Sequence, residues 1–259
     1  MIDLTEAKKV FKDYTSNFRV ADQKVDIKII HTMGVTKIAG YIAREMNLSE
    51  EDIALAELIG LLHDIGRFEQ AVRFNNYNDY ETIDHADFGA DLLFIEKLIE
   101  RFIDDRQYDR IIEKAIRNHN KFSVEEGLAE RELLHANIIR DADKTDNFEV
   151  KQYQDFVSLL GKTENEAEKD LITDIVWEEF LKKSTIVSSH RITSMDCWLS
   201  YIAWVFDYNY KPGLKYLKEN DCVNKVIDRL NYQDSDTKEK MEYARKMVNE
   251  YINMRLANS

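Results

Sequence analysis

The sequence is poor in the residues that end or bend helices. It contains one proline, Pro212, and eight glycines among 259 residues, while leucine, isoleucine, alanine, glutamate and lysine are abundant. Proline and glycine interrupt helices, and the abundant residues favour them. Hydrophobic residues make up 44% of the chain, which is enough for a large core. These properties argue against disorder and predict an all-α fold.

Positive charge is scarce relative to negative charge. Lysine and arginine number 36 against 49 aspartates and glutamates, which gives a formal net charge of −13. This sign opposes general attraction to a nucleic-acid backbone or to an anionic membrane. We therefore expect neither as a partner, and a small anionic substrate would need cationic side chains close to its binding site.

Cysteine is also scarce, and long apolar runs are absent. The two cysteines, Cys197 and Cys222, have no CxxC partner, and the first residues, MIDLTEAKKV, lack the charged and apolar regions of a signal peptide. No apolar run approaches the roughly 20 residues that span a bilayer. We therefore expect a soluble protein in the reducing cytoplasm.

Apolar residues recur at three- and four-residue steps in five segments, which is typical of helices that face a core. Each segment carries candidate metal ligands. The segments are residues 26–46 with His31, residues 49–68 with His63 and Asp64, a helix that begins near His85, residues 109–120 with His119, and residues 130–148 with the acidic run DADKTDN. Residues 69–84 lack a helical stripe and are predicted to form a loop with functional potential.

The pattern stays helical beyond residue 150 and becomes richer in aromatic residues. Trp198, Tyr201 and Trp204 follow one another at three-residue steps, which we interpret as a packed core stripe in preference to a base-stacking surface. No flexible linker, repeat or low-complexity tract sets this part apart. We predict a core domain at residues 1–150 and a C-terminal helical extension at residues 151–259, packed on it as one globular unit.

The histidines and aspartates of the five segments form an inventory of metal ligands. Mixed imidazole and carboxylate donors suit iron, manganese, zinc, cobalt or nickel. Two such ions about 3.5–4 Å apart are commonly bridged by a carboxylate, and Asp64, next to His63, is the natural bridge. A single histidine on an apolar stripe is more often a hydrogen-bonded core residue than a ligand. Spacing alone leaves both interpretations open.

Two motifs resemble the HD-domain superfamily of metal-dependent phosphohydrolases. The opening half of that domain is similar to HTMGVTKIAGYIAREMNLSEEDIALAELIGLLHDIGRFEQ, and its closing Ala-Asp element is similar to IIRDADKTDN. Additional histidines, found in branches that hold two metals such as cyclic-dinucleotide phosphodiesterases and dinucleoside-tetraphosphate hydrolases, are similar to those of IDHADFGADLLF and IRNHNKF. The resemblance covers about residues 26–150 and implies an HD-domain helical bundle.

The resemblance also implies one or two divalent metal ions, with magnesium as a further candidate. By position it assigns the first metal to His31, His63, Asp64 and Asp143, and a second metal to His85 and His119. Asp141 competes with Asp143 for the closing role, but the Ala-Asp step of the superfamily selects Asp143. The two aspartates lie about 200° apart on a helix, so they cannot both face one metal. Asp146 and Asn147 share more of the Asp143 face and are candidates for hydrogen bonds to the ligands.

Three cationic side chains are candidates for binding a phosphorylated substrate. Arg67, one turn past the metal if the helix continues, would bind a phosphate oxygen in a bidentate manner, and a surface ion pair is the alternative. Lys121 and Lys144 lie beside ligand candidates and could supply further positive charge. His135 lies about 80° round the helix from the closing aspartate, which favours a buried role over ligation. His190 has no informative context.

The implied reaction is hydrolysis of a nucleotide or other small phosphoester by a metal-activated water, which attacks phosphorus in line with the departing oxygen. Asp64 would orient this water or take its proton, and Arg67 would stabilise charge on the phosphoryl oxygens. One alternative is an iron-dependent oxygenase of the HD type, which uses the same ligand set. The other is a metal- or nucleotide-binding sensor with little turnover, with the C-terminal helices as its output surface.

Overall fold

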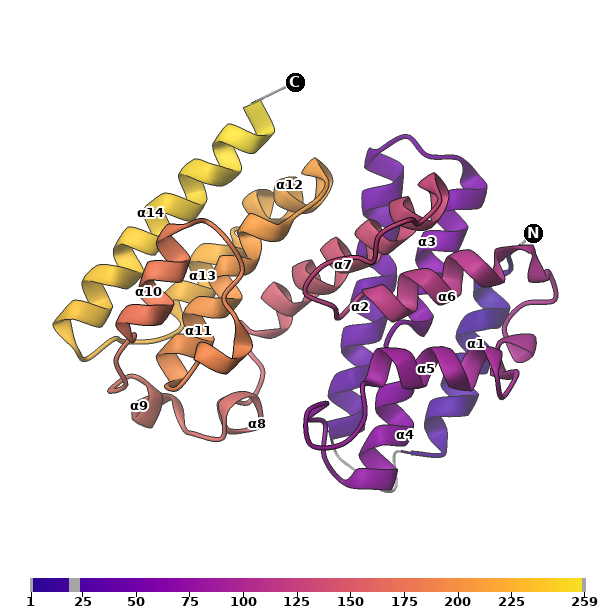
Figure 1. The fold of residues 1–259 in the computed structure, drawn as a ribbon, viewed down its shortest axis with the longest axis horizontal. Coiled ribbons are helices and arrows are strands. Elements are labelled where there is room, and N and C mark those ends of the chain that lie inside the picture. The colour runs from indigo at the N-terminus through magenta and orange to yellow at the C-terminus, as the bar shows by residue number, and fades with distance from the viewer. Residues whose placement is uncertain (1, 19–23, 258–259) are drawn as a thin grey trace. The chain divides into compact units, whose positions relative to one another are not determined.

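The computed structural model describes residues 2–18 and 24–257, and their regular structure is helical (Figure 1). None of these residues forms a β-strand, which confirms the all-α prediction. The chain divides into two compact units, Met1–Asp146 and Asn147–Ser259. The helix α7 (Glu130–Val150) crosses the boundary between the units at residue 146, and the predicted division at residue 150 falls at the end of this helix. No helix within the described ranges has both the length and the hydropathy needed to cross a bilayer.

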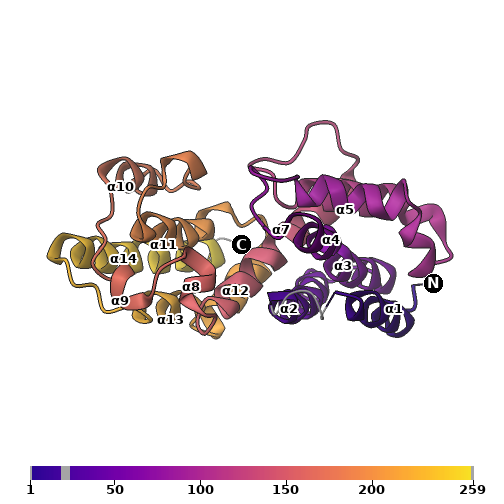
Figure 2. The same ribbon diagram turned by 90° about the horizontal axis from the view of Figure 1, so that it is seen from below.

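The first unit is built of helices around one central helix. They are α1 (Leu4–Ser16), α2 (Lys24–Glu45), α3 (Glu50–Leu62), α4 (Ile65–Phe74), α5 (His85–Phe94), the 3-10 turns η1 (Leu98–Arg101) and η2 (Arg106–Tyr108), α6 (Asp109–Asn118) and the larger part of α7 (Glu130–Val150). α3 packs against α1, α2 and α6, and Figure 2 shows it between α1 and α2 on one side and α5 on the other. Leu55, Leu58 and Leu62 of α3 are fully buried, as expected for a helix that is apolar on most faces.

The end of α3 places a histidine and an aspartate in the interior. Ser49 caps the start of this helix by accepting a hydrogen bond from the backbone N–H of Asp52. The helix ends at Leu62, and the chain turns at His63 and Asp64 before α4 begins. Because of this turn, both side chains of the pair lie inside the unit, at 0% and 3% exposure.

Gly66 allows α4 to approach α5 closely. A Cβ atom at this position would lie 2.3 Å from the carbonyl oxygen of His85 and 2.8 Å from the backbone nitrogen of Gly89. Backbone atoms of a packed helix cannot move aside as the end of a side chain can, so the approach requires a residue without a side chain. The start of α5, with His85, therefore lies next to the turn between α3 and α4.

The loop predicted at residues 69–84 begins too early. α4 continues to Phe74, because Phe68, Gln70 and Ala71 are buried in the first unit. The helix ends at Asn75, which has a φ of 49°, a left-handed conformation that asparagine tolerates. The loop itself covers residues 75–84. Arg67 and Gln70 therefore stand on a helix and reach the loop with their side chains.

The second unit has its own core of aromatic and aliphatic side chains. Its helices, after the end of α7, are α8 (Phe156–Leu160), α9 (Glu164–Ala167), α10 (Asp174–Leu181), η3 (Ser188–His190), α11 (Ser194–Ala203), η4 (Trp204–Asp207), α12 (Lys211–Glu219), α13 (Cys222–Asp228) and α14 (Ser235–Ala257). Trp198 is fully buried, and Tyr201 and Trp204 pack against the same core. This confirms the interpretation of these three residues as a core stripe.

Candidate metal centre

Four histidines from four segments of the first unit converge in its interior. His31 lies on α2, His63 ends α3, His85 begins α5 and His119 follows α6. Each is at most 6% exposed. Neighbouring rings lie edge to face, with centroids 5.5 Å apart for His31 and His63, 5.1 Å for His63 and His119, and 4.9 Å for His85 and His119. The structure thus brings together the histidines that the sequence analysis selected.

Asp64 lies among the four rings and turns one carboxylate oxygen toward each pair. Its Oδ2 is 3.9 Å from Nε2 of His31 and 3.7 Å from Nε2 of His63. Its Oδ1 is 3.2 Å from Nε2 of His85 and 3.7 Å from Nε2 of His119. The ligand atoms of His31, His63 and Asp64, the first set, lie within 4.8 Å of one another. Those of Asp64, His85 and His119, the second set, do so as well, and each set is compact enough to hold one metal ion. This carboxylate can therefore bridge two cations.

The other ring nitrogen of each histidine has a hydrogen-bond partner. Nδ1 of His63 is 2.8 Å from the carbonyl oxygen of Gly60, and Nδ1 of His119 is 2.7 Å from that of Ile116. For the other two histidines the partner is a carboxylate at 2.6 Å, Asp146 for His31 and Asp79 for His85. A carbonyl or carboxylate oxygen accepts a hydrogen bond, so Nδ1 carries a proton and Nε2, which faces Asp64, is the nitrogen that would bind a metal ion after losing any proton of its own. This is the arrangement of histidine ligands in metal sites.

The Nε2 atom of His63 shows that the cluster suits a metal ion. This atom is buried and has no hydrogen-bond partner. Burial lowers the pKa of His63 to about 4, so the ring is neutral near pH 7. An unpaired buried acceptor is costly unless a ligand occupies its lone pair. A divalent cation fits this donor set, because it would accept the lone pair and offset the charge of the carboxylates.

Asp143 lies beside the two histidines of the first set and is a further candidate ligand there. Oδ1 of Asp143 is 3.0 Å from Nε2 of His31 and 4.0 Å from Nε2 of His63, and its side chain is 23% exposed. Burial opposes the charged form of His31, but hydrogen bonds with Asp143 and Asp146 raise its pKa to about 9. These distances favour Asp143 as the closing ligand. Asp141, its competitor, is fully buried on the same helix.

Asp146 reaches His31 because α2 has a glycine at the point of contact. A Cβ atom on Gly34 would lie 1.8 Å from Oδ1 of Asp146, so any side chain there would displace the carboxylate. Asp146 thus makes the hydrogen bond that the sequence analysis considered for it. Asn147, considered with it, accepts a hydrogen bond from Nζ of Lys151 at 2.8 Å.

Comparison with known families agrees with this geometry. Residues 29–147 match the family model described as the HD domain. These residues form an HD domain. The match includes every candidate ligand from His31 to Asp143 and ends at the boundary between the two units. No curated protein and no solved structure matches the chain. The HD domain belongs to a superfamily of metal-dependent phosphohydrolases, and its buried histidine and aspartate cluster can hold a metal ion.

Arg67 of the HD domain is held beside the cluster by the loop at residues 75–84. Its Nη1 lies 2.6 Å from the carbonyl oxygen of Tyr77 and 2.7 Å from Oδ1 of Asp79. Its Nε is 3.8 Å from Oδ1 of Asp64, and this buried nitrogen has no hydrogen-bond partner. The side chain is only 15% exposed, so Arg67 is not the surface ion pair considered as an alternative.

Asp79 was not selected as a site residue from the sequence. Its carboxylate lies between Arg67 and His85, within 2.7 Å of a nitrogen of each. Burial would raise the pKa of Asp79, but the hydrogen bond with His85 and the charges of His85 and Arg67 lower it well below its usual range. The only signal in the sequence was the absence of a helical stripe around it.

Lys28 was also missed, although it lies one helical turn before His31. Its Nζ is 2.9 Å from Oδ2 of Asp64. Burial opposes ionisation of Asp64, but the charges of Lys28 and His63 bring its pKa well below the usual range. The three-residue spacing to His31 is a signal that could have identified Lys28, because residues three apart share a helix face.

Lys121 and Lys144 lie in different settings. Nζ of Lys121 is 2.6 Å from Asp84 and 2.8 Å from Asp87, so two carboxylates already neutralise it. Asp84 also forms a close group with Asp79 and His85. The two carboxylates of this group are already paired, Asp84 with Lys121 and Asp79 with Arg67. Lys144 is half-buried on α7 next to Asp143.

The two remaining histidines lie away from the cluster. His135 is buried, and its Nε2 is 3.0 Å from Oδ1 of Asp52 at the start of α3. His190, in the second unit, has its Nδ1 2.8 Å from Glu179. Neither imidazole belongs to the ligand groups found in the described residues.

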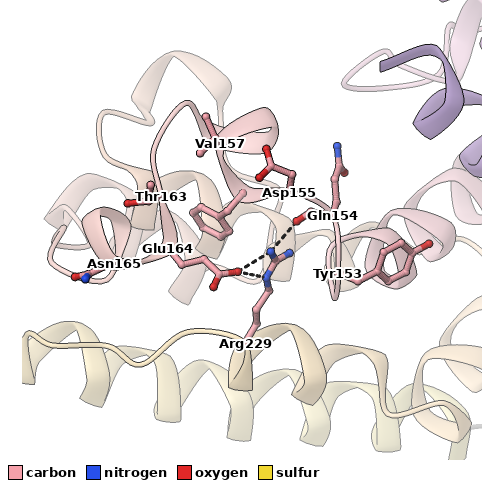
Figure 3. A pocket seen from close by; sticks show the side chains of 9 residues that line it. Tyr153, Gln154, Asp155, Val157, Thr163, Glu164, Asn165 and Arg229 are labelled. Atoms are coloured by element: carbon pink, nitrogen blue, oxygen red, sulfur yellow. Dashed lines mark hydrogen bonds and ion pairs between the residues drawn. The ribbon is translucent and has the colours of Figure 1, made fainter. Parts of the chain in front are cut away.

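A pocket in the second unit, of about 420 Å³, does not contain this chemistry (Figure 3). One side of the pocket is the segment that includes α8, and Arg229 lies on the other side. The guanidinium of Arg229 donates to Glu164 at 2.6 Å and to the backbone oxygens of Lys151 and Gln154 at 2.6 Å. These hydrogen bonds hold the segment that includes α8 in place, so Arg229 stabilises the structure of this unit. The HD cluster is the site that the ligand chemistry favours.

Proposed function

We propose that the HD domain hydrolyses a small phosphoester, with a nucleotide as the preferred class of substrate. The observation that carries this proposal is the position of Asp64, which directs one oxygen to the Nε2 atoms of His31 and His63 and the other to those of His85 and His119. A bridging carboxylate between two imidazole pairs is the arrangement used to hold two divalent ions side by side.

The chain offers one set of ligands for each ion. The first set is His31, His63, Asp64 and Asp143, and the second is Asp64, His85 and His119. Iron, manganese, zinc, cobalt and nickel suit these donors. When bound, such ions lower the pKa of a water molecule to near neutrality and offset charge on phosphoryl oxygens.

Asp64 acts on the attacking water in this scheme. Its pKa lies well below the usual range, which makes it a poor acceptor for a full proton. We therefore assign it the role of orienting the water by accepting a hydrogen bond, so that a lone pair of the water points at phosphorus in line with the leaving oxygen.

Two cations flank Asp64 and are suited to bind the phosphoryl group. Lys28 contacts Oδ2 at 2.9 Å, and Nε of Arg67 lies 3.8 Å from Oδ1. Charge-assisted hydrogen bonds from these groups to non-bridging oxygens would hold the substrate and stabilise charge that develops during the reaction. Lys144 remains a candidate for a more distant part of the substrate, whereas Asp84 and Asp87 already neutralise Lys121. Lys28 and Arg67 thus supply positive charge beside the site in a chain whose net charge is −13.

We also propose a reducing compartment such as the cytoplasm as the location. Cys197 and Cys222 are both free thiols. Free buried or half-buried cysteines persist where disulfides do not form.

The test combines metal analysis with activity on a panel of nucleotides and phosphoesters. We expect the wild type to retain a transition metal and to release phosphate or a nucleoside monophosphate, and His63→Ala and Asp64→Asn to lose activity by at least about 100-fold. His190→Ala is the matched control, because it removes a histidine outside the cluster. A wild type that binds no metal would refute the proposal. Turnover that requires iron and O₂ would support the oxygenase instead, and nucleotide binding without turnover would support the sensor.

A further inference from the structure

Asp79, in the loop at residues 75–84, contacts both a candidate ligand and a candidate cation. Its Oδ2 lies 2.6 Å from Nδ1 of His85, and its Oδ1 accepts a hydrogen bond from Nη1 of Arg67 at 2.7 Å. Oδ1 also accepts from Nε2 of Gln70 at 3.0 Å. Each oxygen thus serves a different part of the candidate centre, a ligand on one side and a cation on the other.

The loop is built to hold this aspartate in place. Gln70, which is fully buried on α4, also donates to the hydroxyl of Thr82 and to the backbone oxygen of Ile83. Side chains of Asn76 and Asn78 accept hydrogen bonds from backbone N–H groups two residues further along, which fixes the turns on either side of Asp79. The carboxylate is therefore positioned by a fixed turn and a buried amide.

The contact with His85 acts on the second set of ligands. A carboxylate at Nδ1 fixes the tautomer and the ring orientation and makes Nε2 a stronger donor. Asp146 has the same relation to His31 in the first set. Each set thus contains one histidine supported by a carboxylate.

The contact with Arg67 acts on substrate binding. Because Nη1 is held by the loop, Nε stays near Oδ1 of Asp64, where it has no hydrogen-bond partner and can donate to a phosphoryl oxygen.

We propose that Asp79 is a positioning residue that couples the second metal site to phosphate binding, by holding His85 and Arg67 with one carboxylate. This inference rests on the proposed function. It means that an ion held by His85 and a phosphoryl group held by Arg67 depend on the same loop, and that both weaken when Asp79 is replaced.

The experiment uses Mn²⁺ and inorganic phosphate as probes of the full-length chain. Calorimetric titration with Mn²⁺ measures the two metal affinities, and titration of the Mn²⁺-saturated protein with phosphate measures anion binding. The variants are Asp79→Asn and the matched control Glu81→Gln. Glu81 is an exposed carboxylate of the same loop that accepts a hydrogen bond from Asn76.

We expect Asp79→Asn to weaken the second Mn²⁺ site by about 10–100-fold and to leave the first site within about threefold. Phosphate affinity should fall by about tenfold, the effect of one misplaced charge-assisted hydrogen bond. Glu81→Gln should match the wild type in both titrations. If Asp79→Asn does not fold, as judged by its thermal melt, Asp79→Glu replaces it, with the same expected directions.

The outcomes separate this inference from the function on which it rests. A wild type that binds no Mn²⁺ overturns both. A wild type with two Mn²⁺ sites, together with an Asp79→Asn variant that matches Glu81→Gln, overturns the coupling and leaves the proposed function intact. Loss of only one of the two affinities in Asp79→Asn also overturns the coupling.

Discussion

The ammonium group of Lys28 lies 2.9 Å from Oδ2 of Asp64, on the side of that carboxylate that faces His31 and His63. Asp64 is 4% exposed at its side chain and Lys28 is 28% exposed, so the pair joins the interior to the surface. A cation in the first set would contact the same oxygen. Binding of a metal there would therefore weaken this ion pair and make the ammonium available to an anionic substrate.

Replacing Lys28 should separate substrate binding from metal binding. In Lys28→Met the KM for the phosphoester should rise by about 10–100-fold, because one charged hydrogen bond to a phosphoryl oxygen is lost. The affinity for Mn²⁺ should increase, because the metal no longer competes with the lysine for Asp64. Steady-state kinetics and calorimetry measure the two effects.

Lys37→Met is the control for this variant, since Lys37 is an exposed lysine on the same helix. It removes the same charge from α2 at a distance from Asp64. An unchanged KM and Mn²⁺ affinity in Lys28→Met would contradict the role assigned to this residue.

Gly34 offers a way to disturb the first set without touching a ligand. The Cβ of Gly34→Ala would meet Oδ1 of Asp146 at 1.8 Å and push the carboxylate away from His31. We expect the affinity of the first metal site to fall by about 10–100-fold, as in Asp146→Asn. The double variant should lose little more than either single variant, since both remove the same contact.

Met33→Ala is the matched control for Gly34→Ala, because Met33 is a 38% exposed neighbour on the same helix. Metal titrations of the wild type and of these four variants decide the question. Additive losses in the double variant would show that Gly34 and Asp146 act independently.

The four clustered histidines could be selected as ligand candidates from the sequence because each carries a local signal. His31, His63 and His119 lie on apolar helical stripes, and His63 precedes an aspartate in a motif of the HD domain. The stripes also predicted the helices. Burial follows helical spacing, so residues that share a stripe arrive in the same interior.

Asp79 lacks such a signal, and the signal for Lys28 is limited to its three-residue spacing from His31, because the contacts of both residues join separate segments of the chain. Lys28 contacts Asp64, 36 positions further along the chain, and Asp79 contacts Arg67, 12 positions before it. The end of α4 was misjudged for a related reason. The buried amide of Gln70 bonds to loop residues that no helical pattern reveals, so tertiary contacts extended the helix past the predicted boundary.

The stability of the metal-free protein should depend on pH through His135. Burial lowers the pKa of His135, although the neighbouring Asp52 opposes this effect. A histidine whose folded pKa lies below its unfolded value of 6.5 binds fewer protons in the folded state. Its contribution to stability is therefore present above about pH 6.5 and is lost as the pH falls below that value.

The variant His135→Gln isolates this contribution. The difference in free energy of unfolding between wild type and variant should be larger at pH 7.5 than at pH 5, since only the wild type has this titrating group. Urea unfolding in the presence of a chelator measures it, and the other histidines cancel in the comparison. A difference that grows as the pH falls would mean that the folded pKa is raised.

Gly66 tests whether the close approach of α4 and α5 builds the second set of ligands. In Gly66→Ala the new Cβ would lie 2.3 Å from the carbonyl oxygen of His85, so the two helices must separate. We expect a loss of about 1–3 kcal/mol in the free energy of unfolding, as for other overpacked sites. Because His85 starts the helix that moves, its Nε2 would shift relative to Asp64 and the second Mn²⁺ site should weaken more than the first. Val72→Ala, at a half-exposed position of α4, is the control and should retain both sites. Equal weakening of the two sites in Gly66→Ala would point to general destabilisation of the HD domain instead of local displacement of His85.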